Sequence, residues 1–288
     1  MENMENMEND EKHVEDQCHG NHWDCVLSEK TEFKKLLSDS LEKSHLYGQL
    51  ETDYVLTSKI RGTVSMLEYD CKKSDPIVIR NVIVENAEKQ NELASGYPVV
   101  RKGNLLSVKI TKIIEWESGL EAWITGELEN ECEITFFDAD YAINKDKYNV
   151  GKSYNFVVGA LSYYAEEPES KGFKFEGQKA IDFKAKIGEE VEYDEDGNVK
   201  PVEFSTEKLC AFFQTGPSPD DAEYISTVKA VKSVESLEKS FWSFEIIFRG
   251  VEEKEIFIPT FVRKTSENKN LNKAPQIQGV LWVTGYLV

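Results

Sequence analysis

Short segments rich in β-branched and aromatic residues follow one another closely along this chain, and they constrain its fold more than any other feature. Gly, Pro, Asn or Asp separates them, and no long helical pattern lies between them. Such a succession favours antiparallel barrels or sandwiches over a parallel α/β sheet. The segments are VLTSKIRGTVSML, DPIVIRNVIVEN, LLSVKITKIIEW, LEAWITGEL and CEITFFDADY.

An internal repeat supports this prediction. Four segments recur in the same order in two halves of the chain, and a polar connector precedes the fourth in each half. Agreement of four segments in order favours a duplication over a chance likeness of amphipathic strands. The pairs are VKITKIIE (108–115) with VKAVKSVE (228–235), LEAWITGEL with SFWSFEIIF, EITFFDADY (133–141) with EIFIPTFVR (255–263), and SYNFVVGALSY with VLWVTGYLV.

The order of three strands, a polar or helical connector and a further strand is typical of a five-stranded OB-like barrel. Two such modules would occupy most of residues 95–288. The second copy ends at Val288 just after its fourth segment, so its remaining strand must come from upstream. We expect EKLCAFFQ at 207–214 to supply it.

The fold expected is therefore mainly β, with two OB-like antiparallel β-barrel modules, one N-terminal amphipathic helix and a disordered acidic tail. The triplet MEN, repeated three times, predicts the tail, and Phe33, Leu36, Leu37 and Leu41 lie at helical spacing within a predicted helix over 28–46. The expected divisions are the tail (1–26), the helix with strands that pack on the first module (27–94), module 1 (95–185), an acidic hairpin on Asp196-Gly197 with a linker (186–222), and module 2 (223–288), completed from 200–214.

The C-terminal segments resemble a group of bacterial proteins. From DDAEYISTVKAVKSVE to IQGVLWVTGYLV, the chain is similar to bacterial tandem OB-fold-like proteins of poorly described function, whose last strand closes on a similar Gly-Val-Leu-Trp…Gly-Tyr-Leu run. The resemblance covers about the last quarter of the chain. It implies a fold and carries no catalytic or binding residues.

Charge and cysteine content favour some partners and compartments over others. The net charge of −19 repels phosphate, nucleic acid and anionic lipid on average, and it favours a basic protein as the partner. Five scattered cysteines are too few for a disulfide framework in 288 residues. With neither a signal sequence nor an apolar run long enough to span a bilayer, we expect a cytoplasmic protein with no membrane partner.

The stretch QCHGNHWDC is the candidate metal site. Cys18, His19, His22 and Cys25 are all ligand types that zinc prefers, and His13 lies just upstream. The spacing is poor, since structural zinc sites usually use two separated ligand pairs, and adjacent Cys18 and His19 cannot both face one ion easily. A solvated tail with no cofactor is the favoured interpretation, and tail-bound zinc is the alternative.

Asp138 and Asp140 in FFDADY are the candidate centre of a metal-dependent enzyme. Alternate residues of a strand share a face, so these two carboxylates could hold Mg²⁺ or Mn²⁺. An Asp at the end of a strand that enters a helical connector also suits N-capping, which is the favoured interpretation. Neither a P-loop, a calcium loop nor a nucleophile elbow is present in the sequence.

OB-like barrels can also bind single-stranded nucleic acid by stacking bases on aromatic rings beside a basic groove. Against this hypothesis, small barrels need their aromatic residues inside, and lysines often protect strand edges. We therefore expect a non-enzymatic binding or adaptor protein with a protein partner, and single-strand binding is the alternative. The candidate residues for that alternative are Lys109, Lys112, Tyr148, Lys229, Lys232, Arg263, Lys264, Lys269 and Lys273.

Overall fold

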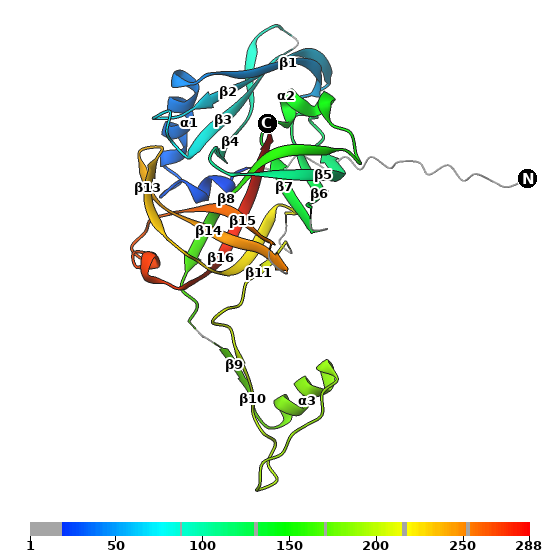
Figure 1. Ribbon diagram of the computed structural model, residues 1–288. Helices are drawn as coiled ribbons and strands as arrows, with labels where there is room; N and C mark the ends of the chain where they lie inside the picture. The colour runs from blue at the N-terminus through cyan, green and yellow to red at the C-terminus, as the bar shows by residue number, and fades with distance from the viewer. Residues whose placement is uncertain (1–18, 87, 130–131, 170–171, 215–217, 252–253) are drawn as a thin grey trace, which may run out of the picture.

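The computed structural model describes residues 19–86, 88–129, 132–169, 172–214, 218–251 and 254–288. The protein is mainly β, as the sequence predicts (Figure 1). One antiparallel sheet has four strands in the order β1-β2-β3-β4. These strands are β1 (His45–Val55), β2 (Lys59–Tyr69), β3 (Ile77–Glu85) and β4 (Asn91–Val100).

The second sheet is mixed and has ten strands in the order β11-β12-β16-β7-β6-β5-β8-β15-β14-β13. Two of its pairings are parallel, β16 with β7 and β15 with β8, so the expectation of purely antiparallel strands is wrong at these two places. The strands are β5 (Asn104–Glu115), β6 (Ala122–Glu127), β7 (Glu133–Asp138), β8 (Ser153–Glu166), β11 (Ala211–Phe213), β12 (Asp221–Thr227), β13 (Lys232–Ser236), β14 (Lys239–Val251), β15 (Lys254–Arg263) and β16 (Gln276–Leu287).

The pairings of the ten-stranded sheet return on themselves because β16 also pairs with β8. One circuit runs β5-β6-β7-β16-β8 and back to β5. A second runs β14-β15-β8-β16-β12, and the chain passes from β12 into β13, which pairs with β14. Strands β8 and β16 therefore belong to both circuits.

This sharing corrects the expected origin of the missing strand. The segment 207–214 forms only β11, which pairs with β12 at one end of the sheet. The strand that pairs with β15 is β8, from the first half of the chain, and the strand that pairs with β7 is β16, from the second half. Each half thus lends its fourth strand to the other.

The helices are few and short. The predicted helix over 28–46 is present but covers only Glu32–Lys43, because the chain is already extended at Ser44 and then enters β1. The Ser28 N–H donates to Glu32 Oε2 at 3.0 Å just before the helix, whose N-cap residue Thr31 makes no side-chain capping bond. The helices are α1 (Glu32–Lys43), α2 (Tyr141–Asn144) and α3 (Gln178–Ile187), with the 3-10 turns η1 (His22–Cys25), η2 (Lys145–Lys147) and η3 (Leu271–Lys273).

The chain between β8 and β11 forms an arm that projects from the body of the protein (Figure 1). It consists of the antiparallel pair β9 (Gly172–Phe175) and β10 (Val202–Ser205), the helix α3, and the predicted turn at Asp196-Gly197. Gly197 has φ +80°, a conformation that glycine adopts without strain, and Tyr193 bridges to Val199 across the turn. Phe175 and Phe183 stack at 5.0 Å between β9 and α3.

Apolar side chains form two buried clusters. The first lies between the four-stranded sheet and the ten-stranded sheet, and it contains Ile77, Tyr97, Phe137 and Trp282. The second is formed by inward residues of the two strand circuits, and its members include Ile124, Phe136, Phe156, Phe244, Ile258 and Leu281.

Candidate functional site

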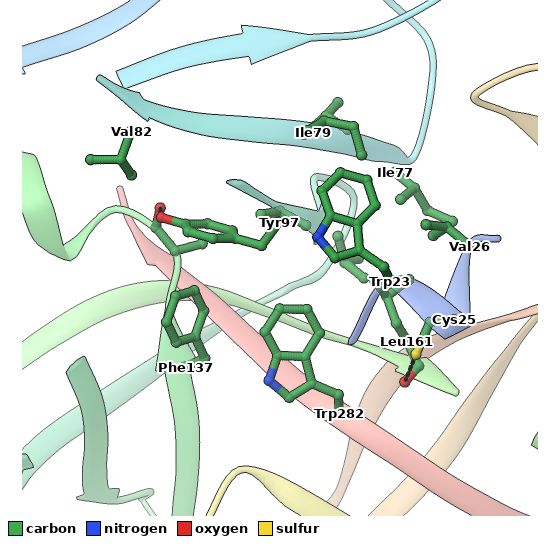
Figure 2. Close-up of a cluster of buried hydrophobic side chains, with 14 of the residues drawn as sticks. Trp23, Cys25, Val26, Ile77, Ile79, Val82, Tyr97, Phe137, Leu161 and Trp282 are labelled. Atoms are coloured by element: carbon green, nitrogen blue, oxygen red, sulfur yellow. Dashed lines mark hydrogen bonds between the residues drawn. The ribbon is translucent and has the colours of Figure 1, made fainter. Parts of the chain in front are cut away.

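The segment from His19 to Leu27 is packed in the core, so the prediction of a disordered tail over 1–26 is wrong for its last eight residues. Trp23, Cys25 and Val26 are fully buried beside Ile77 and Leu161 (Figure 2). Burial of these apolar side chains stabilises the folded position of the segment. The acidic, low-complexity sequence before it did not predict this burial. Residues 1–18, with Cys18 and His13, lie outside the described residues.

Of the four zinc candidates, the structure brings His19 and His22 together. The two rings form a chain of hydrogen bonds with Glu121. His19 Nδ1 and His22 Nδ1 are 2.8 Å apart, and His19 Nε2 is 2.8 Å from Glu121 Oε1. The Cys25 thiol instead donates to the Leu161 carbonyl at 3.7 Å. Within the described residues, no three His, Cys, Asp or Glu side chains gather as a metal site.

Burial and the neighbouring His19 ring lower the pKa of His22 to about 2, so this ring is neutral at physiological pH. It stacks on Trp282 with ring centroids 4.0 Å apart. The segment therefore acts as an apolar and aromatic filler between the two sheets.

This filler covers the outer face of β6 and β7. Trp123 and Phe137 lie directly opposite each other on these strands and belong to the first buried cluster, between the two sheets. The His19 ring lies 4.8 Å from Phe137, and Tyr97 from β4 lies 4.8 Å from the same ring. Hence the outer face of the second and third strands is closed in the first half of the chain.

The outer face of β14 and β15, in the second half of the chain, is hollow. The directly opposed pairs Ser243–Phe261, Glu245–Pro259 and Ile247–Phe257 lie on the outer side of β14 and β15. They form the floor of a groove of about 700 Å³, which we call the β14–β15 groove. Its lining residues are Ser74, Pro76, Lys102, Asn104, Thr227, Lys229, Ala230, Lys232, Val234, Glu235, Ser243, Phe244, Glu245, Ile247, Phe257, Pro259 and Phe261.

Pro259 suits its place on this floor. A proline cannot donate to a neighbouring strand, and β15 pairs with β8 only at Thr260, Phe261 and Val262. The edge of β15 before Thr260 is thereby free of that ladder.

Basic and acidic side chains share the rim of the groove. The Lys229 ammonium lies 5.0 Å from the Phe257 ring centroid and 3.7 Å from Glu255 Oε2. Lys232 lies opposite Ser243 in the β13–β14 pair, and Lys102 Nζ donates to the Ser74 carbonyl at 2.6 Å. Three lysines and two glutamates line the groove, so the rim is mixed, although the whole chain is strongly acidic.

Only two of the predicted nucleic-acid residues line this groove, Lys229 and Lys232. Lys109 pairs with Glu127 on β5 and β6, Lys112 is exposed on β5, and Lys269 and Lys273 are exposed around η3. Arg263 donates to Ser28 Oγ at 3.1 Å.

Two further candidates engage protein groups. Lys264 lies 3.7 Å from the Trp242 ring centroid. The prediction that Tyr148 is a stacking residue is wrong, because Tyr148 is buried and donates to Asp138 Oδ2 at 2.6 Å.

Asp138 and Asp140 are both buried, and both are held by protein groups. Asp140 Oδ1 accepts from Arg80 Nη1 at 3.0 Å, and its Oδ2 accepts from the Tyr47 hydroxyl at 2.8 Å. Burial raises the pKa of Asp138 to about 7, against the hydrogen bond from Tyr148. Asp140 occupies the N-cap position of α2 without a side-chain capping bond, so the capping interpretation is wrong for its carboxylate.

Sequence reasoning missed Lys102, Phe257 and Phe261 as groove residues. A signal was present, because β15 is apolar on both faces: Ile258 and Val262 point inward while Phe257 and Phe261 point outward. A strand that covers only a core has one apolar face, so the second apolar face indicates a further contact or a binding surface.

No protein-family model, curated protein or solved structure matches this chain. None of the helices in the described part of the chain is both long and apolar enough to cross a bilayer.

Proposed function

We propose that this chain is a non-enzymatic binding protein, built from two OB-like barrels that share β8 and β16, and that the β14–β15 groove binds an extended segment of a partner protein. The observation that carries the proposal is the contrast between two equivalent faces. The face of β6 and β7 is filled in cis, whereas the face of β14 and β15 is open.

The strand order supports the OB-like assignment. Each circuit contains three strands, a short helical connector and a fourth strand, and its fifth strand, which runs parallel to the third, comes from the other half of the chain. OB-fold proteins bind their ligands on the face of the second and third strands, and β14 and β15 hold these places in the second half. The resemblance of the C-terminal segments to bacterial tandem OB-like proteins agrees with this assignment.

The groove chemistry favours a peptide over single-stranded nucleic acid. Base stacking needs several accessible rings, and of the two phenylalanines on the floor, Phe261 is 4% exposed. Glu235 and Glu245 would repel a phosphate backbone. An extended peptide can place apolar side chains on Ile247 and Phe257 and acidic side chains near the lysines.

Strand β13 offers main-chain groups beside the groove. Within the described residues, β13 is the last strand of the ten-stranded sheet and pairs with β14 alone. A partner segment could therefore add to its open edge, with alternate side chains directed into the groove. A cytoplasmic location remains a prediction from the sequence.

The test uses fluorescence anisotropy of the full chain with two labelled probes, an eight-residue peptide of alternating Asp and Val and a 20-nucleotide oligo-dT strand. We expect the peptide to bind and Lys232→Glu or Phe257→Ser to weaken it about five- to tenfold. Lys269→Glu, a matched charge reversal outside the groove, should leave binding unchanged. Tighter binding of oligo-dT that weakens steeply with salt would contradict the proposal and support the nucleic-acid alternative.

A further inference from the structure

A second exposed face lies on β11, β12, β16 and β8, apart from the β14–β15 groove. Register places Phe213, Glu223, Val280 and Tyr164 in one row across these four strands. Side chains of directly opposed residues share a face of the sheet, so all four point to the same side. The row beside it contains Ile225, Gln278 and Glu166, and we call the two rows together the aromatic–acidic face.

The rings on this face are open to solvent. Phe213 is 56% exposed and Tyr164 is 52% exposed, whereas Phe212 on β11 and Tyr224 opposite it on β12 pack inward. A hollow of about 340 Å³ is lined by Tyr164, Phe213, Glu223, Tyr224, Ile225, Gln278 and Gly279. Two large exposed rings over one hollow are unusual for a surface that contacts only water.

Each ring has a carboxylate beside it. Glu223 is directly opposite Phe213, and Glu166 is two residues from Tyr164 on the same face of β8. An ammonium or guanidinium group is attracted both to the face of an aromatic ring and to a carboxylate. Each aromatic ring, together with its neighbouring carboxylate, thus forms one potential site for a cationic side chain.

The surroundings strengthen the preference for a cation. The acidic arm begins directly after β8, and the whole chain carries a net charge of −19. A basic segment would approach this face with favourable long-range electrostatics, and an acidic one would be repelled. These charges distinguish the face from the lysine-bearing groove.

We propose that the aromatic–acidic face binds a basic, extended segment of a partner protein, with one Lys or Arg over Phe213 beside Glu223 and another over Tyr164 beside Glu166. The two sites are separated by three strand spacings, about 14 Å, which equals about four residues of an extended chain. Residues i and i+4 of an extended segment also point to the same side. The proposal does not depend on the function of the groove.

The experiment uses the full chain and a biosensor surface that carries the peptide SVTKVTVKTVS, whose lysines are four residues apart. We expect Tyr164→Ser and Phe213→Ser each to weaken binding about two- to fivefold, the magnitude of one exposed cation–π contact. Glu223→Gln, which keeps the side-chain shape, should weaken binding to a similar extent. The peptide SVTEVTVETVS should not bind.

Tyr193→Ser is the matched control, because Tyr193 is 56% exposed but lies on the arm hairpin. It should leave binding unchanged, and so should Lys232→Glu in the groove. The proposal is overturned if the lysine peptide fails to bind, if the glutamate peptide binds equally well, or if Tyr164→Ser has no effect. A fall in sedimentation coefficient on Tyr164→Ser would also overturn it, since a second copy of the chain would then be the occupant.

Discussion

Replacing Arg80 with methionine tests how the buried charges beneath the four-stranded sheet are balanced. Arg80 is 1% exposed and lies on β3. Its guanidinium is 2.9 Å from Glu68 Oε2 and 3.0 Å from Asp140 Oδ1, and it lies 3.3 Å from the centre of the Tyr47 ring. Methionine fills a similar volume without the charge.

The two carboxylates would respond differently. Glu68 keeps Arg101, whose Nη1 lies 3.1 Å from Glu68 Oε1. Of the contacts described above, Asp140 keeps only the hydrogen bond from the neutral Tyr47 hydroxyl. Asp140 is 1% exposed. Removing one partner of a buried pair typically costs about 3–5 kcal/mol, because the remaining charge is uncompensated. We expect a loss near the lower end, about 3 kcal/mol, since one carboxylate stays paired.

Urea denaturation followed by tryptophan fluorescence measures this loss. With a slope of about 3 kcal/mol per molar, as expected for a chain of this size, 3 kcal/mol lowers the midpoint by about 1 M. The control is Arg80→Met with Asp140→Asn, which removes the orphan charge and should recover about half of the loss or more.

The loss should also depend on pH. Burial already raises the pKa of Asp140, and without Arg80 the folded-state pKa rises further above the unfolded value. A raised folded-state pKa gives stability that is complete below the unfolded pKa and is lost as the pH rises through the folded one. Arg80→Met should therefore cost more at pH 8 than at pH 5. A loss below about 1 kcal/mol at pH 8, or equal losses at both pH values, would refute this reasoning.

Three further predictions follow from particular contacts. Asp138→Asn should remove a decline in unfolding free energy between about pH 4 and pH 7, because the folded pKa near 7 lies above the ordinary value of 3.8 for an aspartate; an unchanged pH profile would contradict this. Deleting residues 1–27 should lower the melting temperature by at least about 5 °C, whereas deleting residues 1–18 should not, as differential scanning calorimetry can show. Gly285→Val should cost about 1–3 kcal/mol in urea denaturation, because a Cβ at Gly285 would lie 2.6 Å from Phe136 Cδ2 on β7; normal stability would argue against the shared strand.

The β-rich segments were readable from the sequence because alternation and turn residues are local properties. The internal repeat stays a prediction. The segment LLSVKITKIIEW became β5 and CEITFFDADY became β7. The segment after the helix was missed, because HLYGQLETDYV has an irregular pattern with one polar face and forms β1 only by pairing with β2. Lys229 and Lys232, which line the groove, were selected from the sequence only as candidates for nucleic-acid binding, and that role stays a prediction.

The stretch QCHGNHWDC shows where sequence reasoning failed. Its Cys and His residues matched zinc ligands by type, and its acidic neighbours indicated a solvated tail. The outcome was set by Tyr97, Phe137 and Trp282, which come from three distant strands and form an aromatic surface for His19 and His22. No local pattern contains that surface.

The sequence by itself determined that this is a mainly β protein, since strand periodicity and turn residues act over a few neighbours. Only the tertiary structure decided that β8 and β16 serve both halves, that residues 19–27 close one face, and that the face of β14 and β15 stays open. These outcomes depend on contacts between residues more than a hundred positions apart, such as Thr284 with Gly159 and His19 with Glu121. Each strand has the same alternation whichever partner it takes, so its own residues cannot specify that partner.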